Sequence, residues 1–382
     1  MTTPAPAEVL TTRHADLKDL VTLLRDQQGR KVDVVAPPTA LRAERGRLII
    51  SGTEPMLTPT GVTSTDGVYR PTATCEKGIA EKLKINLPYL RKCRDEAIDL
   101  WDVNVNGWLD RVPRDHKFLI RGFRGSGSGP GIARALLSDS YKRVDHLDVL
   151  TAALDGVEQA GVPITIQGCD LTEQRMYVRV YSPAVQVLAP KLLEGYRSPF
   201  TGAEGAANPV VWAGFVITNS ETGCGAAAIT PRIVFQVCDN GHTITADSHR
   251  AVHLGGKLDE GVIDWSGQTH QKNLELITAK TTDAVRRFLT PAYVQKIVTT
   301  MEAKAGVPIV RPAETIQVVS QQLRFSDQQQ DAILGHFIKG GDLTAGGVMH
   351  AVTSVAQTLT DADTAHEMES RALQALQLAA RG

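Results

Sequence analysis

The chain of 382 residues has no apolar run near the ~18 residues that a membrane-spanning helix needs. Aromatic residues make up only 5% of it, which leaves few rings on which nucleic-acid bases could stack. The N-terminus has no basic region followed by an apolar one, so no signal peptide is expected. The five cysteines are scattered and show no C-x-x-C spacing, which argues against a disulfide framework or a zinc site. We therefore expect a protein of the cytoplasm with no membrane partner.

A strong net charge is also lacking, but the charges are unevenly distributed. The formal net charge is −1, and this balance gives little drive toward non-specific binding of a polyanion. Residues 70–145 nevertheless carry 15 basic and 10 acidic side chains, whereas the other sections are neutral or acidic. This surplus makes residues 70–145 the candidate region for contact with an acidic partner.

Composition and length predict a globular protein with one large domain or two to three smaller ones, since 42% of the residues are hydrophobic and 22% are charged. We expect residues 1–69 to form an N-terminal segment of helix and strands with a mobile loop. Residues 70–290 are expected to form an α+β core that contains the basic region, and residues 291–382 a helical region.

Residues 164–245 predict a β-meander. Val210–Thr218 and Ile229–Cys238 are apolar and β-branched, and turn residues separate them. The sequence Asp239-Asn240-Gly241 supplies a second tight turn, in which Gly241 would have a positive φ. Ile164–Ser182 adds two strands, and Asn273–Phe288 has helical spacing. The expected fold is α+β, with a mostly antiparallel sheet packed against helices and a helical C-terminal third.

Thr74–Asp99 predicts two short helices with a three-residue break, and Pro88 opens the second helix. This arrangement is similar to a helix-turn-helix, whose second helix can enter a groove of DNA. The alternative is a pair of helices in a mixed domain that presents a solvated basic face. The absence of a turn glycine favours this alternative.

A glycine-rich loop follows, Gly125–Gly131, between a predicted strand at Lys117–Phe123 and a helix predicted to start at Ile132–Leu137. A strand, a glycine loop and a helix N-terminus can cradle a phosphate, but the glycine spacing fits neither the P-loop nor the dinucleotide-binding fingerprint. A flexible connector is the alternative. Basic residues near this loop and in the helix pair can line a groove along a sugar-phosphate backbone. The candidate nucleic-acid-binding residues are Arg91, Lys92, Arg111, Arg114, Lys117, Arg121, Arg124, Lys142 and Arg143.

No catalytic residue, cofactor or metal site is predicted. Histidines and carboxylates gather in the sequence around residues 239–270, but their spacing defines no ligand set. Ser138, Ser220 and Cys238 lie in no nucleophile elbow and near no evident base. The sequence therefore does not indicate an enzyme.

Four ordered motifs resemble the phage/plasmid-like family of uncharacterised proteins. The first two are the segments IAEKLKINLPYLRKC (residues 79–93) and RALLSDSYKRVDHLDVL (residues 134–150). The third is NS-x-x-G followed by R-x-x-x-x-VC-x-NG, from Asn219 to Gly241, and the fourth is AGGVMHAVTSVAQ (residues 345–357). This chain has Asp239 and His350 at positions where the family has other polar residues. The resemblance implies a protein of bacteriophages, prophages or plasmids, without an established activity.

Two classes of function remain. The first is a nucleic-acid-binding protein of a phage or mobile element that acts in DNA recombination or replication, as a single-strand-binding or annealing factor. Antiparallel strands followed by a helix are similar to the core of Rad52-like annealing proteins, which is an analogy of fold only. The second class is a non-enzymatic phage interaction or assembly protein, oligomeric and host-modulating. In either class we expect the protein to act in the cytoplasm of a bacterial host and to form a homo-oligomer. The expected partner is single-stranded DNA in the first class and a protein in the second.

Overall fold

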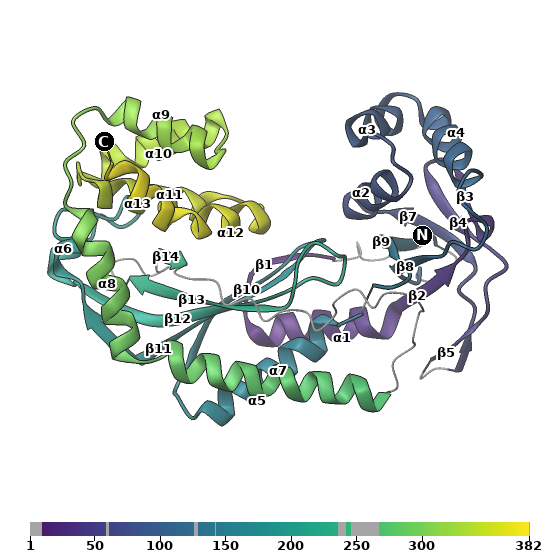
Figure 1. The fold of residues 1–382 in the computed structure, drawn as a ribbon, viewed down its shortest axis with the longest axis horizontal. Coiled ribbons are helices and arrows are strands. Elements are labelled where there is room, and N and C mark those ends of the chain that lie inside the picture. The colour runs from purple at the N-terminus through teal and green to yellow at the C-terminus, as the bar shows by residue number, and fades with distance from the viewer. Residues whose placement is uncertain are drawn as a thin grey trace, which may run out of the picture.

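The computed structural model describes residues 10–58, 61–125, 129–141, 143–235, 242–245 and 267–381. Over these residues the chain is an α+β protein, as the sequence predicted, but it has two six-stranded sheets where one was expected. In Figure 1, the sheet nearer the middle of the molecule carries a helical region at one end and the second sheet at the other. The turn at residues 239–241, with the positive φ expected for Gly241, lies outside the described residues.

The central sheet is the predicted meander. Its strand order is β1-β10-β11-β12-β13-β14, and every pair of neighbours is antiparallel. Its strands are β1 (Thr12–Ala15), β10 (Thr165–Leu171), β11 (Met176–Leu188), β12 (Val210–Asn219), β13 (Ala228–Phe235) and β14 (His242–Thr245). One face of this sheet is apolar because alternate residues of each strand point the same way. Val178, Phe215 and Ile233 are among the buried residues of that face.

The second sheet, which we call the N-terminal sheet, has the order β2-β8-β9-β7-β4-β3. Its strands are β2 (Lys31–Ala36), β3 (Leu41–Glu44), β4 (Arg47–Ile50), β7 (Gly67–Pro71), β8 (Phe118–Phe123) and β9 (Gly131–Ser138). A small hairpin, β5 (Met56–Thr58) and β6 (Gly61–Thr63), extends from it. Because β2 pairs with β8, this sheet joins residues from both sides of the division that we placed after residue 69.

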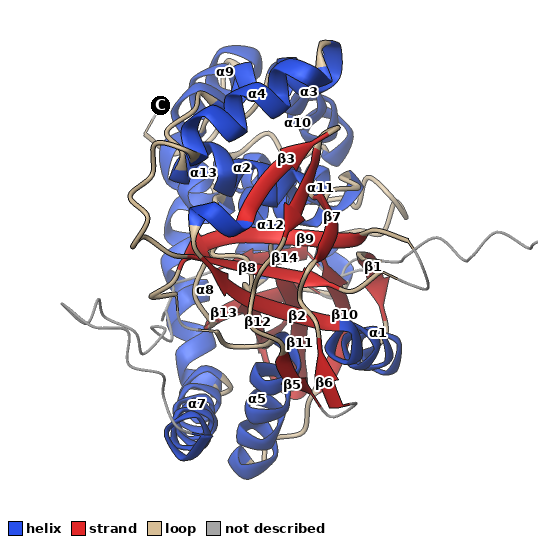
Figure 2. Ribbon diagram, turned by 90° about the vertical axis from the view of Figure 1, so that its right-hand side faces the viewer, coloured by secondary structure: helices blue, strands red, loops and turns tan. Residues whose placement is uncertain are grey.

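Helices cover both sheets (Figures 1 and 2). The N-terminal sheet carries α2 (Ala73–Lys82), α3 (Leu87–Glu96) and α4 (Ile98–Leu109). The central sheet packs on α1 (Leu17–Arg30), α5 (His146–Ala160), α6 (Pro190–Leu193), α7 (Gly267–Phe288) and α8 (Pro291–Ala305). The C-terminal region continues with α9 (Pro312–Leu323), α10 (Asp327–Gly340), α11 (Ala345–Thr358), α12 (Ala362–Ser370) and α13 (Ala372–Ala379). Helix α11 lies at its centre, where residues 345–356 are all buried.

Helices α5 and α7 lie side by side beneath the central sheet (Figure 2). Gly156 makes this close packing feasible, because a Cβ at that position would lie 2.6 Å from the carbonyl oxygen of Thr278. The hydroxyl of Thr282 donates to the Gly156 carbonyl at 3.1 Å across the same contact. The predicted helix at Asn273–Phe288 is therefore confirmed, and it contacts β12 and β13 as well as α5.

The prediction that a helix starts at Ile132 is wrong. Residues 131–138 form strand β9, which pairs with β8 on one side and β7 on the other. A short apolar run suits a buried strand as well as a helix, and here the pairing with two neighbours decides the outcome. Gly131 is needed at the start of this strand, because a Cβ there would lie 2.6 Å from Tyr69 Cδ1 and 2.7 Å from the Phe123 carbonyl oxygen.

A buried network of charged groups joins the two sheets, and we call it the sheet joint. Its members come from β2, β8, β9, the start of α5 and the β12–β13 turn, and they are Lys31, Asp33, Arg121, Arg134, Asp145, His146 and Glu221. The Arg121 guanidinium donates to Asp33 and Asp145 at 2.6 to 3.0 Å and to the Glu221 carbonyl at 3.0 Å. Glu221 accepts from Arg134 and from the His146 N–H, both at 2.6 Å.

The β12–β13 turn begins the third motif that resembles the phage/plasmid-like family. Its contacts in the sheet joint explain its residue types. Asn219 donates to the Val144 carbonyl at 3.2 Å, and Ser220 Oγ accepts from the Cys224 N–H at 2.9 Å. Gly223 has a φ of +81°, which favours glycine. The small cavity beside Glu221 has a volume of about 10 Å³, barely the space for one water. The turn therefore holds the two sheets together and offers no room for a substrate.

Candidate nucleic-acid interface

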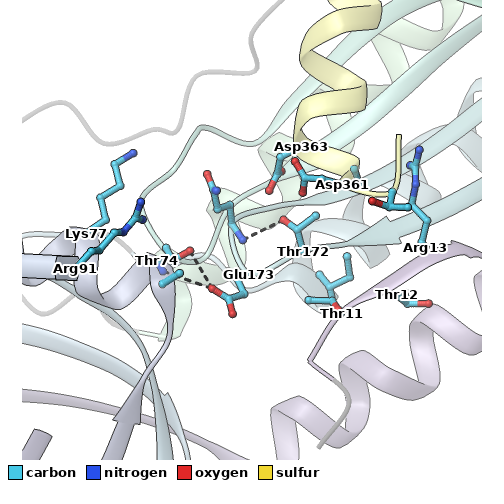
Figure 3. Close-up of a pocket in the computed structure, with 15 residues that line it drawn as sticks. Thr11, Thr12, Arg13, Thr74, Lys77, Arg91, Thr172, Glu173, Asp361 and Asp363 are labelled. Atoms are coloured by element: carbon cyan, nitrogen blue, oxygen red, sulfur yellow. Dashed lines mark hydrogen bonds between the residues drawn. The ribbon is translucent and has the colours of Figure 1, made fainter. Parts of the chain in front are cut away.

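A cavity bordered by described residues lies where the two sheets meet, between helices of the N-terminal sheet and α12 of the C-terminal region (Figure 3). We call it the cleft. Its volume is about 420 Å³, within the ~300–1,000 Å³ of typical ligand pockets. Its lining comes from β1, α2, α3, the β10–β11 turn and the start of α12, and comprises residues 11–13, 73, 74, 77, 91, 171–174 and 360–363.

Hydroxyl groups and charges dominate this lining. Five threonines, Thr11, Thr12, Thr74, Thr172 and Thr360, border the cleft. Thr172 also shapes its floor, because its Oγ1 accepts from the N–H groups of Gln174 and Arg175 and so closes the β10–β11 turn. Hydroxyls in such a lining can hydrogen-bond a polar ligand.

Each of the three carboxylates in the cleft has a partner within the protein. Glu173 Oε2 accepts from the N–H and the hydroxyl of Thr74, at 3.4 and 3.5 Å, at the start of α2 (Figure 3). Asp361 caps α12 by accepting from the Thr364 N–H at 2.9 Å. Asp363 accepts from the Tyr177 hydroxyl at 2.7 Å, and burial raises the pKa of its carboxyl. The acidic groups are thus engaged in holding the local structure.

Two of the three cations that line the cleft have no close ion-pair partner among the described residues. Lys77 is exposed and makes no ion pair or hydrogen bond with the part of the chain that the structure describes. Arg91 is half exposed, and its Nε lies 4.0 Å from Glu76, a carboxylate that already accepts from Arg94 at 2.6 Å. Figure 3 shows Lys77 and Arg91 together on the wall opposite Asp361 and Asp363. The third cation, Arg13, pairs with Asp170. The α2–α3 wall therefore carries two cations, Lys77 without an ion pair among the described residues and Arg91 with a long one to Glu76.

The structure separates the residues proposed from sequence. Arg91 lines the cleft, while Lys92 points to solvent near Glu96, 3.8 Å away. Arg111, Arg114, Lys117 and Arg143 are exposed and lie outside the cleft lining. Arg124 is partly buried and donates to the Gly29 carbonyl at 3.1 Å. Lys142 lies outside the described residues.

The structure places Arg121 in the interior and not in a surface groove. Its side chain is completely buried in the sheet joint, so it cannot contact a nucleic acid on the surface. The carboxylates of Asp33 and Asp145 surround it and raise its pKa even though burial alone would lower it. The sequence-based prediction placed Arg121 in a groove from its charge alone, because its acidic partners are distant in the sequence.

The phosphate-cradle alternative for the glycine loop required a helix after the loop, but Gly131–Ser138 form strand β9. The helix that could supply N–H groups is missing, and residues 126–128 lie outside the described residues. The carboxylates and histidines considered as metal ligands, at positions 239, 247, 249 and 253, also lie outside them.

Sequence reasoning missed Arg13, Lys77 and Glu173. Lys77 lies on α2, the first helix of the predicted helix pair, four residues before Glu81. The helical pattern of this segment already indicated which face is exposed. Arg13 and Glu173 carry no local signal, because only the pairing of β1 with β10 brings them to the cleft. A comparison of the chain with protein-family models, curated proteins and solved structures found no match.

Proposed function

We propose that this protein binds single-stranded nucleic acid, preferably DNA, in the cleft and without base specificity. The observation that carries the proposal is that Lys77 and Arg91 lie together on one wall of a cavity bordered by five threonines, Lys77 without an ion pair among the described residues and Arg91 4.0 Å from Glu76. Cations and hydroxyls are the groups that contact phosphates and sugars, and such contacts do not distinguish bases.

The biological setting rests on the resemblance to the phage/plasmid-like family. It supports a role in recombination or replication of a phage or mobile element, within the cytoplasm of a bacterial host. Among the described residues, every helix is too short or too polar to cross a membrane.

Binding is tested with a fluorescently labelled oligonucleotide and titration at several salt concentrations. The double variant Lys77→Ala/Arg91→Ala should weaken binding similarly for all sequences and flatten the salt dependence by ~0.7 per lost phosphate contact. The matched control is Lys296→Ala/Lys304→Ala, which removes the same charge from exposed positions of α8. Equal losses in both variants would mean that net charge alone is responsible, and no binding by the unaltered protein at low salt would refute the proposal.

A second candidate function, a protein that acts through protein partners, is favoured by one observation. Helix α4 exposes Leu100, Val103 and Trp108 to solvent. Exposed apolar side chains that form a stripe mark surfaces for protein contact more often than isolated ones do.

A further inference from the structure

Helix α4 exposes three large apolar side chains on one side. Leu100, Val103 and Trp108 are 46%, 65% and 46% exposed, although they stand on a helix whose other face buries Trp101, Val105 and Leu109. Tyr89 of α3, 46% exposed, lies beside them, and Asn104 donates to its hydroxyl at 3.3 Å. Residues 100, 103, 104, 107 and 108 follow the helical repeat, so they form one continuous stripe. We call this stripe the α4 face.

Gly107 lies in the middle of this stripe without a reason inside the protein. Glycine in a helix interior is less stable than alanine because it loses more backbone freedom on folding. At Gly78 and Gly156, which also lie in helices, a neighbouring carbonyl oxygen excludes a side chain, but a Cβ at Gly107 would meet only the end of Arg111, at 3.8 Å. A glycine on an exposed apolar stripe lets a second surface approach the helix backbone closely, which explains its presence.

The charges at the two ends of α4 have opposite sign. Asp95, Glu96 and Asp99 lie around its first turn, and Arg111 and Arg114 follow its last turn. Asp95, Asp99 and Arg114 are exposed and form no ion pair within the described part of the chain. A copy of this helix in antiparallel orientation would place its basic end on the acidic end of the first. This arrangement is self-complementary, as a two-fold interface requires.

We infer that the α4 face binds a second copy of this chain, with the two α4 helices antiparallel around a two-fold axis. Leu100 of one copy then packs against Trp108 of the other, and both apolar stripes leave the solvent. The axis passes near Asn104, whose Nδ2 donates to the Leu100 carbonyl at 2.7 Å and whose carbonyl oxygen accepts nothing from the described residues. A single polar residue at such a position fixes the register of two helices.

This assignment gives Arg111 and Arg114 a role different from the one proposed from sequence. They contact Glu96 and Asp99 of the second copy in place of a phosphate. Helix α4 has 12 residues and is therefore about 18 Å long, so the contact is at the small end of stable interfaces. We expect a dimer that dissociates on dilution. The dimer does not depend on nucleic acid, so its test is separate from that of the cleft.

Sedimentation of the full chain between about 1 and about 100 µM tests the dimer. The unaltered protein should rise from the mass of a monomer to that of a dimer, and Val103→Glu should remain monomeric at the highest concentration. Val310→Glu is the matched control, because Val310 is 89% exposed but lies outside the α4 face, and this variant should dimerise normally. A monomer at all concentrations, or a dimer that survives Val103→Glu, would overturn the inference.

A charge exchange tests the antiparallel orientation. Variant one carries Arg111→Glu and Arg114→Glu, and variant two carries Glu96→Lys and Asp99→Lys. Each variant alone has like charges at both ends of α4 and should be monomeric, whereas an equimolar mixture should form a dimer. Circular dichroism confirms that each is folded. Failure of the two folded variants to associate when mixed would exclude the antiparallel arrangement.

Discussion

Arg121 and Asp33 face each other directly across β8 and β2, and both oxygens of the carboxylate accept from the guanidinium. The Nε–Oδ1 distance is 3.0 Å and the Nη2–Oδ2 distance is 2.9 Å. The pair is buried, with 0% of the Arg121 side chain and 5% of the Asp33 side chain exposed. Because the same guanidinium also reaches Asp145 and the Glu221 carbonyl, one side chain connects the N-terminal sheet to α5 and to the turn of the central sheet.

We expect Arg121→Ala to destabilise the protein by about 3–5 kcal/mol, since it leaves the buried carboxylate of Asp33 without its cation and takes one of two cations from Asp145. Urea denaturation followed by circular dichroism measures this loss. Arg124→Ala is the control from the same strand end, and it should cost less than about 1 kcal/mol because its hydrogen bonds are partly exposed. If Arg121→Ala unfolded at the same urea concentration as the unaltered protein, the sheet joint would not stabilise the fold.

Glu221 should make the protein sensitive to acid. Burial raises its pKa, but His146, Arg134 and Arg121 outweigh burial and hold the pKa well below its usual range. A carboxylate with a lowered folded pKa stabilises the fold above its ordinary pKa of about 4.5, and this stability is lost as pH falls below that value. Glu221→Gln should therefore unfold more easily at pH 7 and lose less stability between pH 4.5 and 3. Thermal unfolding across that range provides the measurement, and an unchanged acid slope would contradict the prediction.

Two buried histidines should weaken the fold in a higher pH window. Burial lowers the pKa of His146 to about 4 and that of His366, next to Arg179, to about 3. The unfolded chain takes up these protons near pH 6.5 while the folded chain does not, so stability is full above pH 6.5 and falls as the pH drops toward 4. The His366 ring lies against Tyr177, with centroids 4.6 Å apart.

His366→Phe keeps an aromatic ring at this position and removes the titrating group. Its stability should fall less steeply than that of the unaltered protein between pH 6.5 and 4, by up to ~1.4 kcal/mol per pH unit. Denaturation midpoints at half-unit steps would show the difference. Parallel curves for the two proteins would mean that His366 takes up its proton in the folded state as readily as in the unfolded one.

Glycines at two positions should respond in opposite directions. Gly131→Ala places a Cβ against Tyr69 and the Phe123 carbonyl, and we expect a loss of at least ~1 kcal/mol because backbone must move. Gly335→Ala in α10 meets nothing within 4 Å and should stabilise the protein by about 0.5–1 kcal/mol. Differential scanning calorimetry compares the two variants. A gain in stability from Gly131→Ala would contradict the strand assignment of residues 131–138.

The central sheet could be predicted because its signals are local. Alternating β-branched residues and the turn after Asn219 lie within one stretch of sequence, and consecutive strands pair. Strand β9 could not be predicted, because its neighbour β7 precedes it by the whole of α2, α3 and α4. Helix α9 lies in the predicted helical region, and its Pro312 stands at the first helical position.

The candidate site was less predictable than the fold. Arg121 looks in the sequence like any surface arginine, and its partners Asp33 and Glu221 lie 88 and 100 residues away. Composition directed attention to Arg91, which lines the cleft, yet the lining also comes from β1, the β10–β11 turn and α12. A sum of charges over a segment cannot tell a basic side chain that is paired in the interior from one that is free on a wall.

The pairing of β1 with β10 has a consequence for the order of folding. All strands of the N-terminal sheet lie within residues 31–138, so this sheet can close while later residues are still being synthesised. Strand β1 precedes the other described strands, but it can pair only after β10 has been synthesised, since Arg13 and Asp170 are 157 residues apart. Contacts so distant form late. In pulse-labelled hydrogen exchange during refolding, we expect β2 and β8 to become protected before β1, so that the earliest of the described strands is among the last to pair.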